Sequence, residues 1–171
     1  MDAAFIAQSR YYLQDDFLPK IERAVALIDE ETIWWRPNPA SNSIGNLMLH
    51  LAGNVRQWIV SGIAGAANTR QRQLEFDTQG PMPAVELLTR LRHAVAEACG
   101  VLSRLEPDTL SESRQIQGND VSVMEAIYHV VEHFSMHTGQ ILYIVKLRTG
   151  EPFGFYKATE NGQANVRWNA E

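Results

Sequence analysis

Three histidines repeat at a spacing of four residues in the segment "HVVEHFSMHTGQI", which covers residues 129–141. The chain has five histidines, so His129, His133 and His137 place most of them in one short window. On a helix, residues four apart lie on one face one turn apart, near enough for two imidazoles to reach one metal ion. The same spacing holds zinc in H-E-x-x-H helices. The segment therefore predicts a metal-binding face on a helix.

One ion cannot bind all three of these imidazoles. They cover an arc of about 80° at roughly 100° per residue, and the outer two are about 12 Å apart along the axis at about 1.5 Å rise per residue. A pair with a third ligand from another segment is the workable arrangement. His50, in "GNLMLHLAGNVRQW", is the candidate third ligand, because a strip of polar residues at helical spacing surrounds it. The strip consists of Asn46, Asn54 and Gln57.

Three imidazoles suit a divalent ion with open coordination positions. Neutral imidazole binds zinc and similar ions readily, and three protein ligands leave at least one position free. Such an ion generates hydroxide near neutral pH or binds a thiolate. A closed structural site would need a fourth protein ligand, and none is obvious. The alternative is that these are hydrogen-bonded core histidines, and their spacing does not decide between the two.

Four long helical segments would position these side chains. Apolar residues recur at helical spacing over residues 5–28, 44–62, 84–105 and 123–149. Pro19 predicts a kink or an early break in the first segment. Ser43 is a suitable N-cap for the second. Ser122 and Glu125 form an S-x-x-E capping box before the fourth, and Gly150 follows its end.

The segments between the helices read as loops. Residues 29–43 carry two prolines, residues 63–83 read as a connection, and a polar stretch separates the third helix from the fourth. We see no β-hairpin signal, so we expect an all-α four-helix bundle with an irregular tail over residues 151–171. The long middle connection could span a helix of about 30 Å, which would let the second and third helices run parallel.

Length, composition and charge restrict the function. The chain of 171 residues suits a single domain spanning residues 1–171. A net charge of −5 argues against nucleic acid or an anionic membrane as the partner. The N-terminus shows no secretion signal, and we find no apolar run long enough to cross a bilayer. The single cysteine, Cys99, fits a reducing cytoplasm.

Two motifs together resemble a known protein family. "LMLHLAGNVRQWI" followed by "HVVEHFSMHTGQI" is similar to the DinB-like (YfiT-like) superfamily of small bacterial four-helix metalloproteins. Its hallmark is a histidine on the second helix and H-x-x-x-H-x-G-Q on the fourth. "RPNPASNSIGNLMLHLAGN", "QLEF" and "HFSMHTGQILYIVKL" resemble a branch known only as a domain of unknown function. The resemblance extends from about Phe5 to Tyr156, and the combined motif is more specific than either half.

The resemblance implies a fold, a metal and a class of reaction. It implies an up-down-down-up bundle in which His50, His133 and His137 bind a divalent ion, most often zinc or nickel. Asn54, beside His50, could orient that ligand or touch metal-bound water. Characterised relatives are S-transferases or isomerases that use low-molecular-weight thiols, some members were taken for metal-dependent hydrolases, and homodimers are common. Gln140 closes the motif, and His129, outside it, lines the pocket or is a core histidine.

Three functions follow as hypotheses. The first is a metal-dependent transferase acting with a low-molecular-weight thiol on a small-molecule substrate. The second is a metal-dependent hydrolase; Glu132, next to His133, points about 100° away on a helix, and no other carboxylate stands out as a base. The third is a non-enzymatic, stress-related protein with a stabilising ion.

Several other side chains have two interpretations. Arg70 and Arg72 could bind the carboxylate of a thiol, although a solvated run of charge is the simpler interpretation. Trp34 and Trp35 could cap a pocket or a dimer partner, or anchor their loop on the core, which we favour. His93 is expected at the surface. Nothing near Cys99 would activate it as a nucleophile.

Overall fold

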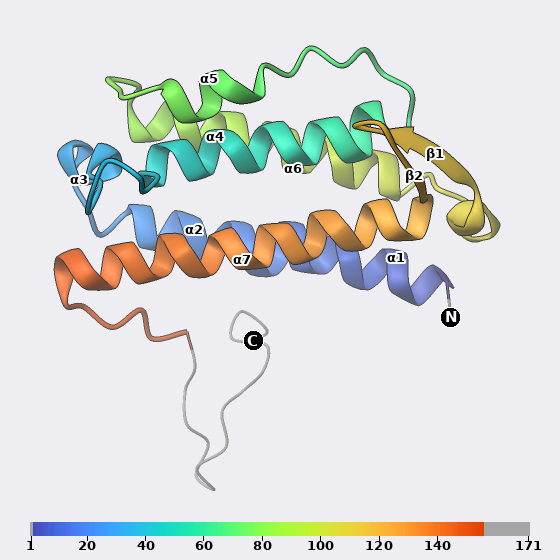
Figure 1. The fold of residues 1–171 in the computed structure, drawn as a ribbon. Helices are drawn as coiled ribbons and strands as arrows, with labels where there is room; N and C mark the ends of the chain where they lie inside the picture. Colours follow the sequence, from blue (N-terminus) through green and yellow to red (C-terminus); the bar gives the residue numbers. More distant parts are fainter. Residues whose placement is uncertain (1, 156–171) are drawn as a thin grey trace, which may run out of the picture.

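The computed structural model describes residues 2–155, which are mostly helical with one two-stranded sheet. Figure 1 shows the long helices in two layers, with α4 (Ile44–Val55) and α6 (Ala84–Leu102) above α1 (Asp2–Tyr11), α2 (Leu18–Val25) and α7 (Val123–Thr149). Helix α4 packs against both α6 and α7, so it lies where the layers meet. The all-α expectation is therefore correct in outline, and the small sheet is an addition to it.

The first predicted helix continues through Pro19 instead of breaking there. Helix α1 leads into the π-helical stretch η1 (Tyr12–Phe17), and α2 follows directly and ends at Val25. Pro19 lies in the first turn of α2, where its missing N–H matters least. The irregularity that proline causes thus appears as a π-helical stretch just before it.

The second predicted helix begins at its expected N-cap. The Ser43 hydroxyl accepts a hydrogen bond from the Asn46 N–H, and the Asn46 side chain accepts one from the Ser43 N–H. After α4, the helix continues as the π-helical stretch η2 (Arg56–Ser61). Nine residues of α4, His50 among them, are buried, as expected for a helix that packs against α5, α6 and α7.

The fourth predicted helix, α7, has both of its predicted ends. The Ser122 hydroxyl accepts from the Glu125 N–H at 3.1 Å, and the Glu125 carboxylate accepts from the Ser122 N–H at 2.7 Å. At the other end Gly150 has a φ of 71°, a left-handed conformation that glycine adopts without a steric penalty. Helix α7 therefore extends over the full length that its sequence signals predict.

Two of the predicted loops contain short helices. Helix α3 (Glu30–Trp34) lies in the first, where the Asp29 carboxylate caps it by accepting from the Thr32 N–H. Helix α5 (Arg72–Asp77) lies in the middle connection and packs on α4. Both helices are too short for a hydrophobic period to reveal them.

A β-hairpin follows the short 3-10 helix η3 (Pro107–Ser111), and our expectation that no hairpin occurs was wrong. Strand β1 (Ser113–Ile116) pairs antiparallel with β2 (Asn119–Ser122), with Ile116 opposite Asn119. The two residues of the turn, Gln117 and Gly118, have φ values of 53° and 79°. Such turns usually carry Asn-Gly or Asp-Gly, and Gln at the first position hides the signal.

The core fills the space between the helices. Its largest fully buried side chains include Phe134 of α7, Leu13 of η1 and Met48 of α4. No helix among the described residues is long and apolar enough to cross a membrane. Residues 151–155 form neither helix nor strand, as expected of the tail, and the rest of that predicted tail lies outside the described residues.

Candidate metal centre

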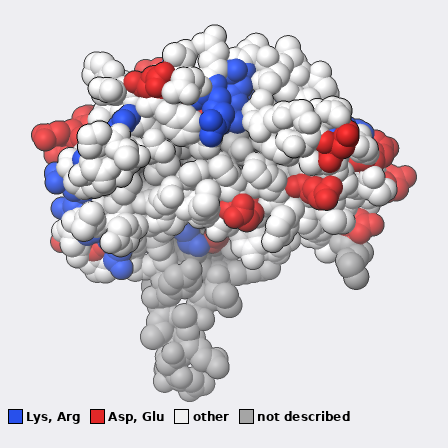
Figure 2. Space-filling model, viewed as in Figure 1, with Lys and Arg blue, Asp and Glu red and all other residues white. Residues whose placement is uncertain are grey.

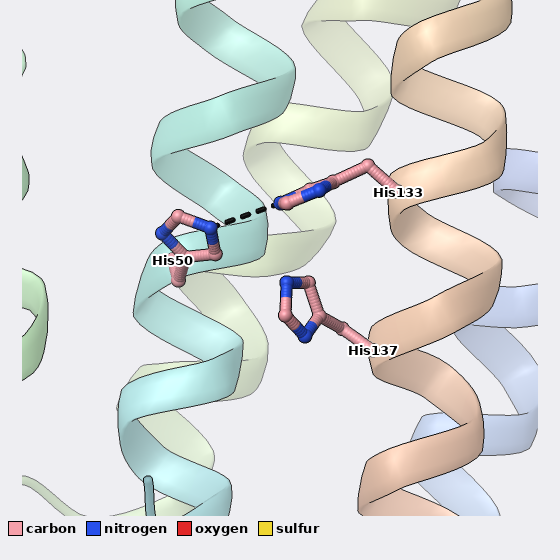
Figure 3. Close-up of side chains that lie close together, drawn as sticks. All are labelled: His50, His133 and His137. Atoms are coloured by element: carbon pink, nitrogen blue, oxygen red, sulfur yellow. Dashed lines mark hydrogen bonds between the residues drawn. The ribbon is translucent and has the colours of Figure 1, made fainter.

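The structure brings His50, His133 and His137 together. One ring nitrogen from each lies within 4.8 Å of the other two, a spacing at which the three could hold a metal ion. The ring centroids are 4.4 to 5.2 Å apart. Figure 3 shows the rings facing one another, His50 from α4 and the other two from successive turns of α7. The side chains of His50 and His137 are buried, and that of His133 is half-buried.

Hydrogen bonds behind two of the rings determine which nitrogen faces the centre. The Nδ1 of His50 lies 2.8 Å from a carboxylate oxygen of Glu75, and the Nδ1 of His137 lies 2.6 Å from the side-chain oxygen of Gln140. Both oxygens can only accept, so we assign the proton to each Nδ1. At His50 the Nη2 of Arg70 also lies 3.1 Å from Nδ1, and the shorter contact to Glu75 decides the assignment. The Nε2 atoms of both rings are therefore left with free lone pairs, which is the form that binds a metal.

The centre has more acceptors than donors. The Nε2 atoms of His133 and His50 are 2.9 Å apart, so one proton can link them. The Nε2 of His137 is buried and has no hydrogen-bond partner among the described residues. A buried acceptor without a partner carries an energetic cost. A divalent cation accepts all three lone pairs, so this donor set fits such an ion.

The environment keeps His133 and His137 neutral. Burial, reinforced by the neighbouring His137 and His50, lowers the pKa of His133 to about 3. Burial also lowers the pKa of His137, against the opposing effect of its hydrogen bond to Gln140. Near pH 7 both rings are therefore neutral, and the nitrogen of a neutral imidazole that carries no proton is the one that coordinates a metal.

A buried ion pair lies behind His50, and the sequence interpretation missed it. Arg70 donates from Nε to one oxygen of Glu75 at 2.6 Å and from Nη2 to the other at 2.7 Å. Burial opposes the ionisation of Glu75, but the hydrogen bonds from Arg70 and His50 outweigh it and hold its pKa below the usual value. Arg70 is thus not part of a solvated run of charge. Our expectation that no carboxylate besides Glu132 would stand out was wrong, since Glu75 contacts His50.

Residues 3–159 match the protein family described as "Protein of unknown function (DUF1572)". The chain belongs to the DUF1572 family. Among solved structures, this DUF1572 protein is similar to a conserved protein from Enterococcus faecalis, with a TM-score of 0.73 and 20% sequence identity. The match covers 85% of this chain and 97% of that one, and at this identity it supports the fold alone. No curated protein matches the chain.

In this DUF1572 protein two further predicted residues, Asn54 and His129, lie beside each other. The side chain of Asn54 is 3.3 Å from the Nε2 of His129, so it contacts this ring and not the expected His50. His129 is half-buried between Trp58, 4.2 Å away between ring centroids, and His133, 5.3 Å away. Burial lowers the pKa of His129, which leaves it neutral as well. His129 therefore stacks on a candidate ligand without joining the cluster of three.

The remaining candidate side chains of the DUF1572 chain have structural contacts. Trp34 donates from its indole nitrogen to the carbonyl of Met82 at 3.0 Å, so it anchors its segment as favoured. Trp35 lies beneath the guanidinium of Arg148 at 4.9 Å. His93 is exposed beside Glu97, as expected. Cys99 is buried, which raises its pKa to about 11, so nothing activates it.

The exposed Arg72 stays close to the centre without pairing with a carboxylate among the described residues. Its guanidinium lies 4.9 Å from the ring centroid of Phe76, and that ring is 4.8 Å from the ring of His50. Figure 2 shows basic side chains gathered on this face near the beginning of α5, while the other charges of both signs are dispersed. The ring of Phe76 therefore lies between the positive charge of Arg72 and the ring of His50.

A large cavity of the DUF1572 protein lies away from the clustered histidines. It has a volume of about 610 Å³ between α4, the middle connection and α6. Arg70 and Glu75 form part of its wall, but none of the three clustered histidines lines it. The ion pair therefore lies between this cavity and His50.

Proposed function

We propose that His50, His133 and His137 bind one divalent metal ion through their Nε2 atoms. The observation that carries the proposal is the convergence of three buried or half-buried imidazoles within 4.8 Å. It is supported by the two hydrogen-bonded Nδ1 atoms, which leave lone pairs on Nε2, and by the unpartnered Nε2 of His137. Zinc or nickel is the ion we expect, because both favour imidazole nitrogen.

The proposed site is open and attracts anions. No carboxylate or thiol among the described residues joins the three histidines in the cluster, so coordination positions remain for a ligand. His133 and His137 are neutral near pH 7, and the charges of Glu75 and Arg70 cancel at close range. A bound divalent ion therefore keeps its full positive charge, which favours an anionic ligand such as a thiolate.

We propose a metal-dependent transferase that acts with a low-molecular-weight thiol on a small-molecule substrate. A bound ion would lower the pKa of a coordinated thiol, so that the thiolate would be present near pH 7. The chain's own contribution is to bury the ligands and to keep His133 and His137 neutral. Arg72 provides a cation near the centre for a second anionic group of the thiol or substrate.

A hydrolase is the second candidate, and the structure offers it less support. It would need a general base near the ion. Glu75 is the carboxylate that contacts a proposed ligand, and His50 and Arg70 already occupy its oxygens. A non-enzymatic protein with a stabilising ion is the third candidate. It is favoured if His50→Ala lowers thermal stability without changing the binding of any thiol.

We also propose a setting for this site. The two layers of Figure 1 and the long middle connection support an up-down-down-up four-helix bundle of the DinB-like type. One contiguous core supports a single domain. The apolar side chains exposed on α7 support a homodimer. The single cysteine, which is free and buried, supports a location in the cytoplasm.

Metal analysis of the purified protein tests the proposal. We expect about one divalent ion per chain in the wild type, and less than about a tenth of that in His50→Ala and His137→Ala, because two imidazoles bind far more weakly than three. His93→Ala is the matched control, since it removes an exposed histidine outside the cluster and should leave the metal content unchanged. Equal metal content in all four proteins would refute the site.

The thiol is tested on cobalt-loaded protein. Adding a small thiol should change the visible absorption of the cobalt, because a thiolate ligand alters its coordination. If the protein binds cobalt but its spectrum does not change with thiol, the metal site stands and the transferase proposal is refuted.

A further inference from the structure

We infer that Glu75, held by Arg70, is a positioning residue that orients His50 toward the histidine cluster. The inference rests on the proposed metal site and extends it to a segment outside the ligands. The Glu75 carboxylate accepts the Nδ1 proton of His50 at 2.8 Å. This contact selects the tautomer and restrains the rotation of the ring, so that Nε2 faces His133 and His137.

Glu75 is itself held in place by Arg70. The guanidinium contacts both carboxylate oxygens, and its third nitrogen donates to the side chain of Gln57 at 2.7 Å. The side chains of Arg70 and Glu75 are only 5% and 10% exposed. A bidentate pair of this kind has little freedom to move, so the hydrogen bond to His50 has a defined direction.

The backbone around Glu75 is also fixed to α4. The Asn46 side chain donates to the carbonyl oxygens of Glu75 and Thr78 at 2.8 and 2.7 Å. Arg36 donates to the Asn46 side chain at 2.8 Å and to the Phe76 carbonyl at 3.1 Å. Asn46 and His50 of α4 and Gln57 of η2 therefore bind the segment 70–78 over successive turns, and His50 is the one of the three that also faces the centre.

Gly53 makes room for this arrangement. A Cβ at this position would lie 2.1 Å from a carboxylate oxygen of Glu75 and 2.9 Å from the Nε of Arg70. A glycine inside a helix costs about 1 kcal/mol relative to alanine. The ion pair can approach α4 closely enough to contact His50 because this residue has no side chain.

Stability alone does not account for the pair. Burying two charges carries a desolvation cost that their attraction only roughly offsets, and apolar residues of similar size often replace such pairs without loss. Here a buried ion pair and a helical glycine occur at one place, against the ring of a proposed ligand. What these features have in common is that together they fix the orientation of the His50 ring.

The first test measures the tautomer of His50 in metal-free protein by nitrogen-15 NMR of the imidazole. We expect the wild type to carry the proton on Nδ1, and Glu75→Ala to lose that preference because the acceptor is gone. An unchanged His50 tautomer in folded Glu75→Ala would overturn the inference. This measurement needs no metal, so it can fail or succeed independently of the proposed function.

The second test measures zinc affinity by competition with a chelator, together with the absorption spectrum of cobalt-loaded protein. Glu75→Ala and Gly53→Ala should each weaken zinc binding about 10- to 100-fold, the usual effect of losing a group that supports a metal ligand. Both should alter the cobalt spectrum. Glu86→Gln, which removes the carboxylate of an exposed ion pair, is the control and should change neither.

The two measurements together separate a positioning role from a purely structural one. If Glu75 only held the connection in place, the variants would have lower melting temperatures while the folded protein kept wild-type zinc affinity and cobalt spectrum. That result would overturn the inference. Absence of zinc binding in the wild type would instead refute the metal site, while the tautomer measurement would still decide the role of Glu75.

Discussion

At the scale of single residues, the candidate centre depends on keeping imidazoles neutral and correctly oriented. His133 has the most strongly lowered pKa of the group, because it is partly removed from water and lies beside three other histidines, His137, His50 and His129. His50 and His137 each have an oxygen behind the ring that keeps the proton away from the centre. Neutral rings with inward lone pairs are prepared for a cation, and they make the protein sensitive to acid.

We predict that acid destabilises the metal-free protein through His133. Its pKa is about 3 in the folded chain and 6.5 ordinarily, so between these values the unfolded state binds more protons. Stability is then fully present above about pH 6.5 and falls as the pH is lowered through this window. Urea unfolding with a chelator between about pH 5 and pH 7.5 should show a shallower pH dependence for His133→Gln than for the wild type.

The exposed His93 provides the control for this experiment. His93→Gln should leave the pH dependence as it is in the wild type. Parallel curves for wild type and His133→Gln would contradict the assignment of the lowered pKa to His133.

At the scale of elements, the long helices and the short ones differ in how they are specified. Helix α7 has local signals at both ends, a capping box at Ser122 and a left-handed glycine at 150, and both were recognisable in the sequence. Helix α5 has no side-chain cap at its start, and Asn46 and Arg36 of other segments hold it on α4. Its position is a property of the fold, which explains why the sequence indicated only a connection there.

The capping box of α7 yields a prediction about stability. Ser122→Ala should lower the free energy of unfolding by about 1 kcal/mol, because the Glu125 N–H loses its acceptor. Ser135→Ala, in the exposed middle of the same helix, is the matched control and should have little effect. Urea denaturation of both variants measures the difference, and equal midpoints would show that the cap contributes nothing.

At the scale of the whole molecule, α7 carries more of the exposed large apolar side chains than any other described helix. Among the described residues, five large apolar side chains on this helix are highly exposed, namely Met124, Tyr128, Met136, Tyr143 and Leu147. Tyr143 is 69% exposed and Tyr128 65%. A row of this kind on one helix is typical of a surface that meets a partner. It is the physical support for the proposed homodimer.

The dimer is tested by sedimentation of the full chain. We expect a dimer for the wild type and a shift toward monomer for Tyr143→Glu, because a buried unpaired carboxylate would disfavour the interface. Val85→Glu changes an equally exposed apolar residue on α6 and should leave the assembly unchanged. A wild-type monomer, or a Tyr143→Glu dimer of unaltered stability, would exclude α7 as the interface.

The sequence by itself determined the features that depend on neighbours along the chain. Helical spacing placed His133 and His137 on one face, and the capping signals of Ser43 and Ser122 located two helix starts. Such features need only the local periodicity of the backbone. The hairpin was missed for a local reason as well, since its turn uses Gln117 where asparagine or aspartate is usual.

Only the tertiary structure decided which distant groups meet. It brought His50 to the α7 histidines, assigned Asn54 to His129, and placed Arg70 and Glu75 behind His50. These contacts join residues from separate segments, and their geometry depends on how α4, α5 and α7 pack. No spacing along the chain encodes that packing, so a carboxylate 25 positions from its histidine carried no signal until the helices were in place.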